Sequence, residues 1–146
     1  MRRFFIIAFV MFFSALQVYA QKTGYINTEK ILSAIPEYTA AQTKLEAIGK
    51  QYQQKIESEY SKIEVMYNSY QQQKAGLSAQ ARQMKENEII EREKNVKELQ
   101  KTYFGQDGLM QKKSQELLDP IKEKVDAAIN KVAQSGNFTI ILDISI

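Results

Sequence analysis

The fold is decided by residues 37–73, EYTAAQTKLEAIGKQYQQKIESEYSKIEVMYNSYQQQ, and by residues 74–79, KAGLSA, which follow them. The first stretch consists mostly of the helix formers Gln, Glu, Lys, Ala and Leu. Its apolar residues recur at steps of three or four, which predicts an amphipathic helix with one stripe facing a partner along its whole length. The stripe contains Tyr38, Ala41, Leu45, Ile48, Tyr52, Ile56, Tyr60, Ile63, Tyr67 and Tyr70.

The second stretch predicts a turn between two helices. Gly76 can take a left-handed conformation, and the hydroxyl of Ser78 can cap a new helix by accepting a backbone N–H. A second apolar seam follows, with residues spaced by sevens: Ile89, Val96, Tyr103 and Met110. We therefore expect a helical hairpin over residues 37–134 with its tip near 74–79. The alternative is one uninterrupted helix, whose stability Gly76 would lower by about 1 kcal/mol. In such a helix the apolar stripe would have no partner within the chain.

The second arm of the hairpin carries two weak points for a helix. The first is Phe104-Gly105-Gln106-Asp107-Gly108 and the second is Asp119-Pro120. Pro120 is well tolerated if Asp119 is a helix N-cap and Pro120 the first helical residue, and it otherwise kinks the arm. We expect a jointed arm in either case.

The residues flanking the hairpin, 21–36 and 135–146, predict a small β-containing body. Residues 24–26 have the composition of a short strand, and Thr28 begins a short helical stretch that Pro36 should end. A turn signal at 135–137 precedes an apolar β-branched run from Phe138, which predicts a buried strand. Because the hairpin brings the chain back, this run can pair with residues 25 and 26. The predicted fold class is therefore mainly α with a small β body.

A two-stranded unit is marginal on its own, so the body needs partners. These are other copies of the chain, or sequence beyond Ile146. Apolar side chains left exposed on such a unit normally mark an interface. The residues expected at this oligomer interface are Tyr25, Ile26, Phe138, Ile140 and Leu142.

Residues 1–20 have the composition of an export signal. Arg2 and Arg3 precede an apolar run that ends at Leu16, and Val18 and Ala20 are suitable residues before a cut at Gln21. The apolar run is shorter than the ~20 residues that span a bilayer, which disfavours the alternative of an uncleaved anchor. An exported chain without cysteine fits a bacterial envelope compartment, so we expect the periplasm and a mature protein of residues 21–146.

The composition excludes most catalytic chemistry. The chain has no Cys and no His, so thiol nucleophiles, His-based acid–base catalysis and zinc or iron–sulfur sites are excluded. Nucleotide-binding loops and the G-x-S-x-G motif are absent from the sequence. The net charge of +3 includes Arg2 and Arg3. Without them, the net charge of the chain is too close to zero for a nucleic-acid-binding protein. We expect a protein that is not an enzyme and needs no metal or cofactor.

The predicted tip is cationic. Residues 65–85 contain no Asp or Glu but include Lys74, Arg82 and Lys85. Such a surface suits anionic partners, namely lipid head groups, lipopolysaccharide or acidic client segments. The alternative is an ordinary solvated surface, since three charges over this length are common.

The first arm is unusually rich in tyrosine for a coiled coil, which normally prefers Leu and Ile in its seam. Tyr52, Tyr60, Tyr67 and Tyr70 offer large amphipathic contacts that need no full burial, as expected of an adaptable binding wall. The alternative is an interhelical seam in which the tyrosine hydroxyls reach solvent.

Taken together, these features resemble the Skp/OmpH-type periplasmic chaperones. The resemblance is carried by residues 24–32 (GYINTEKIL) and Pro36-Glu37-Tyr38, by the Lys/Gln/Glu-rich hairpin, and by Tyr103-Phe104-Gly105. Further on it is carried by Leu118-Asp119-Pro120-Ile121 and by residues 138–143 (FTIILD). Members of the family continue past the last segment with another strand and a helix, so the resemblance implies residues beyond Ile146 or a smaller body.

The resemblance implies a homotrimer in which a β-rich body carries three helical-hairpin tentacles around a cavity. It also implies a function: holding unfolded outer-membrane β-barrel proteins in the periplasm without ATP. The tyrosines and the tip cations would then be the client-binding residues. The competing hypothesis is a structural coiled-coil spacer or adaptor of the cell envelope.

Overall fold

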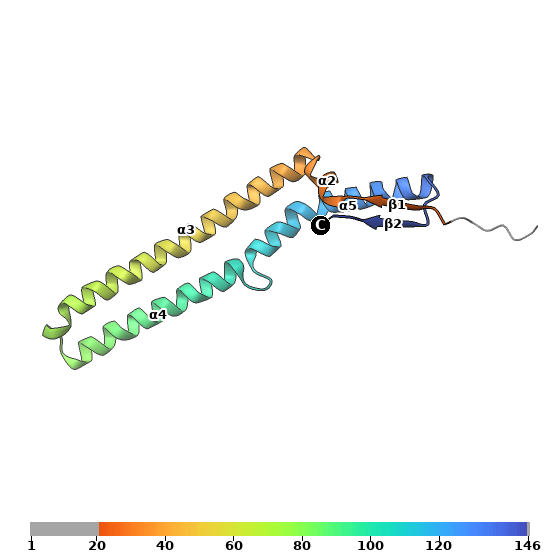
Figure 1. Cartoon of the computed structure of the whole chain (residues 1–146). Helices are drawn as coiled ribbons and strands as arrows, with labels where there is room; N and C mark the ends of the chain where they lie inside the picture. The colour runs from red at the N-terminus through yellow and green to blue at the C-terminus, as the bar shows by residue number, and fades with distance from the viewer. Residues whose placement is uncertain (1–20, 146) are drawn as a thin grey trace, which may run out of the picture. The chain divides into compact units, whose positions relative to one another are not determined.

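The computed structural model describes residues 21–145 (Figure 1). Its elements are β1 (Thr23–Ile26), α2 (Thr28–Ser33), α3 (Pro36–Gln73), η1 (Lys74–Gly76), α4 (Ala79–Phe104), α5 (Leu109–Ser135) and β2 (Ile140–Asp143). The predicted leader, residues 1–20, lies outside the described residues, as does Ile146. The described chain divides into a hairpin unit, Ile31–Asp126, and a strand unit formed by residues 21–30 and 127–145.

The first arm of the hairpin unit is α3, which begins where the sequence predicts a break. Ile35 is extended, with φ −94° and ψ 114°, as the residue before a proline prefers. Pro36 then occupies the first helical position, where its missing N–H has no intrahelical partner to lose. With 38 residues, α3 is about 57 Å long at 1.5 Å per residue.

The turn at the end of α3 is made by η1, Leu77 and Ser78. Leu77 is extended, and the Oγ of Ser78 accepts a hydrogen bond from the backbone N–H of Ala81 at 3.3 Å, which confirms the predicted N-cap of the next helix. The prediction of a left-handed Gly76 is wrong, because no glycine among residues 21–145 has a positive φ. The chain reverses instead through a single tight 3₁₀ turn followed by the extended Leu77.

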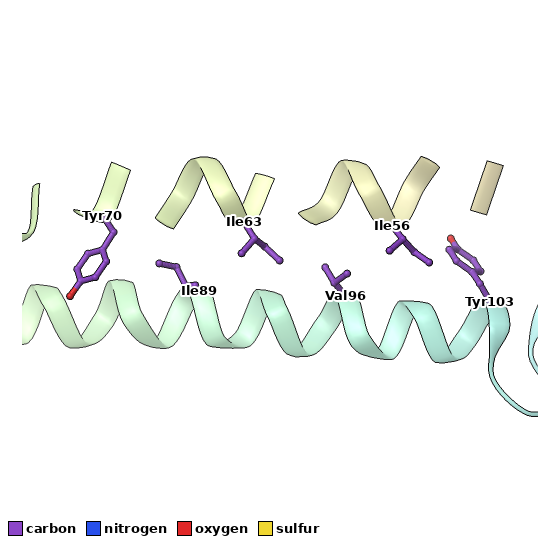
Figure 2. Packing of buried hydrophobic residues seen from close by; sticks show 6 residues of the cluster. All are labelled: Ile56, Ile63, Tyr70, Ile89, Val96 and Tyr103. Atoms are coloured by element: carbon purple, nitrogen blue, oxygen red, sulfur yellow. The ribbon is translucent and has the colours of Figure 1, made fainter. Parts of the chain in front are cut away.

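The core of the hairpin unit is a seam between α3 and α4. It is built from three buried residues of each helix at seven-residue spacing: Ile56, Ile63 and Tyr70 from α3, and Ile89, Val96 and Tyr103 from α4. Figure 2 shows these side chains alternating along the two antiparallel helices, so that each of the four between Tyr70 and Tyr103 lies between two from the facing helix. The predicted fold class, mainly α with a long hairpin and a small β part, is confirmed.

The predicted joint in the second arm lies between α4 and α5, at residues 105–108. Asp107 adopts a left-handed conformation with φ 59°. A Cβ at Gly108 would lie 2.8 Å from the carbonyl oxygen of Gly105 and 2.9 Å from that of Tyr103, so this turn requires glycine there. Pro120 lies inside the continuous helix α5, so Asp119 is not the N-cap of a new helix.

The strand unit contains a two-stranded parallel sheet. β1 and β2 pair with Thr23 opposite Ile140, Tyr25 opposite Leu142, and Ile26 opposite Asp143. Successive side chains of a strand point to opposite faces, so Tyr25 and Leu142 share one face while Ile26 lies on the other. The expectation of a buried strand is wrong for this chain, because Ile140 and Leu142 of β2 are exposed.

The covered face of the sheet is organised around Phe138. A Cβ at Gly24 would come within 3.0 Å of the Phe138 ring, and a Cβ at Gly136 within 2.5 Å, so both glycines make room for that ring. The ammonium of Lys22 lies 4.3 Å from the ring centroid and donates a 2.8 Å hydrogen bond to the carbonyl oxygen of Gly136. Phe138 is therefore half-buried within its own chain rather than exposed, and so is Ile26.

The end of β2 is tied to the start of α2 by Asp143. Its Oδ1 accepts hydrogen bonds from the backbone N–H groups of Thr28 at 3.2 Å and Ser145 at 3.0 Å, and from the hydroxyl of Ser145. These hydrogen bonds favour the ionised carboxylate and hold the pKa of Asp143 well below its usual range. The hydrogen bond from the Ser145 hydroxyl has the largest effect. Asp143 thus links the two ends of the strand unit.

We expect Asp143→Ala to lower the thermal unfolding midpoint by several degrees at pH 7. A carboxylate whose pKa is depressed by folding stabilises the folded state above its unfolded pKa, which is near 3.8. This stabilisation declines as the pH falls further, so the midpoints of wild type and variant should approach each other progressively from about pH 4 down to pH 2. Circular dichroism melts across this range test the prediction, with Asp126→Ala as an exposed control. A midpoint difference that is constant with pH would contradict it.

Candidate functional site

The hairpin unit exposes large apolar side chains on both sides of its seam: Val65, 69% exposed, lies on one side, and four others lie together on the opposite side. Tyr60 and Tyr67 of α3, and Ile90 and Phe104 of α4, are between 42% and 61% exposed. Tyr60 and Tyr67 are seven residues apart and Ile90 and Phe104 fourteen, so each pair follows a single stripe of its helix. We call these four residues the tyrosine face. The expectation that Tyr60 and Tyr67 belong to the interhelical stripe is therefore wrong.

A shallow groove of about 380 Å³ lies between Tyr67 and Ile90, and neither Tyr60 nor Phe104 is among the residues that line it. Tyr67, Gln71 and Lys74 line it from α3, and Glu86, Ile90 and Glu93 line it from α4, with Tyr70 and Ile89 of the seam also contributing. The hydroxyl of Tyr70 donates a hydrogen bond to the carboxylate of Glu86. This hydrogen bond is the main cause that raises the pKa of Tyr70, and burial raises it further. The phenol therefore stays protonated and acts as the donor.

The opposite side of the seam is charged. Lys55 and Lys62 of α3 are seven residues apart, as are Lys85 and Arg92 of α4, and we call these four residues the cationic face. Glu59 lies among them and pairs with Lys62 at 2.6 Å. The hydrogen bond from Lys62 is the main cause that lowers the pKa of Glu59, and the charges of Lys62, Arg92 and Lys55 lower it further. This face therefore carries more cations than carboxylates around one ion pair, and the exposed Val65 lies beside it.

Two of the four predicted client-binding tyrosines belong to the seam. Tyr70 is only 3% exposed. Tyr52 is half-buried and stacks on Tyr103, with ring centroids 4.3 Å apart and planes 2° from parallel. The ring of Phe104 meets Tyr52 edge-on at 6.2 Å. Tyr60 and Tyr67 are thus the predicted tyrosines that offer free ring surface.

The three predicted tip cations do not form one patch. Lys74 lines the groove on the tyrosine side, where its Nζ lies 5.4 Å from the centroid of Tyr70. Lys85 is half-buried and lines a groove on the cationic side together with Val65, Ser69 and Glu88. The Nε of Arg82 donates a 3.0 Å hydrogen bond to the carbonyl oxygen of Leu77, so this guanidinium helps to close the turn.

The predicted interface residues lie on both faces of the small sheet. Tyr25, Ile140 and Leu142 share the exposed face, where Tyr25 is 75% exposed. Ile26 and Phe138 are half-buried and lie away from that face, so they are less available to another copy. Ile144, which the sequence analysis did not include, is also exposed and directly follows β2.

Sequence analysis missed the α4 half of the tyrosine face. Ile90 and Phe104 are fourteen residues apart, out of phase with the seam residues Ile89, Val96 and Tyr103. This second heptad phase, one residue after the seam, was the signal that could have found them.

The tyrosine face places aromatic and aliphatic side chains beside polar ones. Among residues 21–145, no three His, Cys, Asp or Glu side chains come together as a metal site requires. Within the same range, no helix is both long and apolar enough to cross a membrane. The tyrosine face combines aromatic and aliphatic surface with hydroxyl donors and acceptors, which suits reversible contact with many partners.

A comparison with protein families gives one match. The model of the family described as outer membrane protein (OmpH-like) matches residues 22–146, which include both the strand unit and the hairpin unit. None of the curated proteins compared with the chain matches it.

Proposed function

This chain belongs to the OmpH-like outer membrane protein family, and we propose that it is an ATP-independent periplasmic holdase for unfolded outer-membrane proteins. The family is one of chaperones rather than enzymes, and its members are periplasmic. The observation that carries the proposal is the tyrosine face. Its four large apolar side chains are partly exposed to water, and they can be buried against apolar surface of another molecule.

The proposal includes export and assembly. Cleavage after Ala20 releases the mature protein into the periplasm, and three copies associate through the exposed sheet face of Tyr25, Ile140 and Leu142. A two-stranded sheet with one apolar face in water is marginal, and association of copies covers that face. Several hairpins acting together hold one client more tightly than any single hairpin, because each further contact is intramolecular.

The test of the proposed function is suppression of aggregation without nucleotide. A urea-unfolded transmembrane β-barrel protein is diluted into buffer with an equimolar amount of the mature trimer, and light scattering is recorded. We expect scattering to fall nearly to the buffer baseline, because the client is held in solution. Scattering equal to that without the protein would favour the spacer instead.

We also propose that the tip cations contact anionic lipid or lipopolysaccharide. Residues 65–85 carry Lys74, Arg82 and Lys85 without any acid, while Glu86 and Glu93 line the groove of Lys74 and Glu88 lines that of Lys85. Individual surface charges contribute little and are screened by salt over about 8–10 Å, so any effect is largest at low ionic strength.

We expect Lys74→Gln with Lys85→Gln to weaken binding to phosphatidylglycerol vesicles a few-fold at low salt, with no effect at about 0.3 M salt. Arg82 is left unchanged because it bonds Leu77. Vesicle co-sedimentation measures the binding, and Lys97→Gln with Lys101→Gln, far from the tip in sequence, is the matched control. Equal loss in both pairs would show a general charge effect rather than a role of the tip.

A further inference from the structure

The first residue of the mature protein, once the leader is cut after Ala20 as proposed, is Gln21. Glutamine is the one encoded residue whose side-chain amide can close a five-membered ring with its own free α-amino group. Gln21 is exposed and lies outside the helices and strands. It makes no hydrogen bond to any residue of 22–145. Its side chain is therefore free to turn back on its own backbone nitrogen.

The next residue, Lys22, is held by the strand unit. Its carbonyl oxygen accepts a 2.7 Å hydrogen bond from the backbone N–H of Thr139. Its ammonium donates to the carbonyl oxygen of Gly136 and lies 4.3 Å from the centroid of the Phe138 ring. These three contacts tie the start of the mature chain to the segment before β2. Loss of the first two residues would remove all of them.

The alternation of β1 directs Gln21 toward the exposed face of the sheet. The Lys22 ammonium lies over the Phe138 ring, and a Cβ at Gly24 would meet the same ring, so both residues belong to the covered face. Tyr25 lies on the exposed face. Successive residues of an extended chain point to opposite sides, so residue 21 follows the side of Tyr25. A free α-amino group is largely protonated at neutral pH. Each copy would then carry a positive charge beside the proposed contact between copies.

We infer that Gln21 is converted to pyroglutamate after the leader has been cut. The nitrogen of the free α-amino group attacks the carbonyl carbon of the side-chain amide. A C–N bond forms, the bond from that carbon to the amide nitrogen breaks, and ammonia leaves with a proton from the attacking nitrogen. The product is a five-membered lactam, and its nitrogen carries no charge. This inference rests on the proposed cleavage after Ala20 and adds a covalent modification of the new N-terminus.

The ring has two consequences for the strand unit. Aminopeptidases require a free α-amino group, so the lactam protects the N-terminus from trimming and keeps Lys22 in place. The ring also removes one positive charge from each copy beside the exposed sheet face. Because like charges that are brought together oppose association, their removal favours contact between copies.

Mass spectrometry of the mature protein tests the modification. The whole chain with its leader is produced in a bacterium, recovered from the periplasm, and measured at once and after several days at neutral pH. We expect the mass of residues 21–146 lowered by about 17 Da, the mass of ammonia, with the difference confined to the N-terminal peptide.

Gln21→Asn is the matched control for the mass measurement. It keeps a side-chain amide one methylene shorter, which would have to close a strained four-membered ring, so its N-terminal peptide should lose no ammonia. A wild-type chain that begins at residue 21 and keeps its full mass after incubation would overturn the inference alone. A chain that begins elsewhere would contradict the proposed cleavage, and this inference with it.

Two further measurements test the consequences. Under aminopeptidase, residue 21 should be lost at least about tenfold more slowly from the incubated wild type than from Gln21→Asn. Equal rates of loss would overturn the protective role. At low salt the proposed trimer of the wild type should dissociate at a concentration a few-fold lower than that of the variant, and the two should agree at about 0.3 M salt. Equal dissociation at low salt would show that the terminal charge plays no part in association.

Discussion

Val96→Asp is expected to unfold the α3–α4 hairpin at neutral pH. Val96 is 4% exposed and packs between Ile56 and Ile63 of the facing helix (Figure 2). No cation is among the residues that form this cluster, so the new carboxylate would be buried without a partner. An unpaired buried charge is among the few single changes that cost on the order of 4 kcal/mol or more, which is a large part of the stability of an ordinary domain. We expect most of the helical circular dichroism signal to be lost.

Met84→Asp is the matched control for this prediction. Met84 lies on the same helix and is exposed, so its replacement removes an apolar side chain and adds the same charge without burying it. Its urea unfolding midpoint should stay close to that of the wild type. If Val96→Asp and Met84→Asp shift the midpoint equally, the seam is not what holds the hairpin together.

Ile140→Asp combined with Leu142→Asp is expected to turn the proposed trimer into monomers. Both residues are exposed within one chain and lie on the same face of the sheet as Tyr25, which we propose as the contact between copies. Two carboxylates from every copy would meet at this contact, and like charges desolvated together oppose association strongly. Sedimentation should show a threefold lower mass. Protection of an unfolded client should fall as well, because single hairpins no longer act together.

Val132→Asp is the control for association. Val132 is an exposed aliphatic residue of α5 in the same strand unit, and its replacement should leave the mass unchanged. A wild-type protein that is already monomeric at micromolar concentration, or a doubly substituted protein that stays trimeric, would contradict the assignment of the exposed sheet face.

Local sequence signals were sufficient to predict the helical hairpin. The cap at Ser78, the break at Pro36 and the turn containing Asp107 and Gly108 each depend on one or two residues and their immediate neighbours. Ile89, Val96 and Tyr103 recur every seven residues, which predicted a seam in the second arm. Apolar side chains that repeat on one face of a helix are buried by packing against another helix. The cap, the break and the turn each involve residues that are close in sequence. The seven-residue period requires a facing helix, but it does not require a particular one.

Which side of each element faces outward could be learned only from the tertiary structure. The tyrosines of α3 form one apparent stripe in the sequence, but the phase of α4 decides that Tyr70 is buried while Tyr60 and Tyr67 remain outside the seam. In the strand unit, the Phe138 ring packs where Gly24 and Gly136 leave room, and this packing decides that Tyr25, Ile140 and Leu142 form the exposed face. The sequence alone determined which elements form, because their signals are local. Only packing between distant segments decided which side of each element faces outward, because burial is a property of pairs of surfaces.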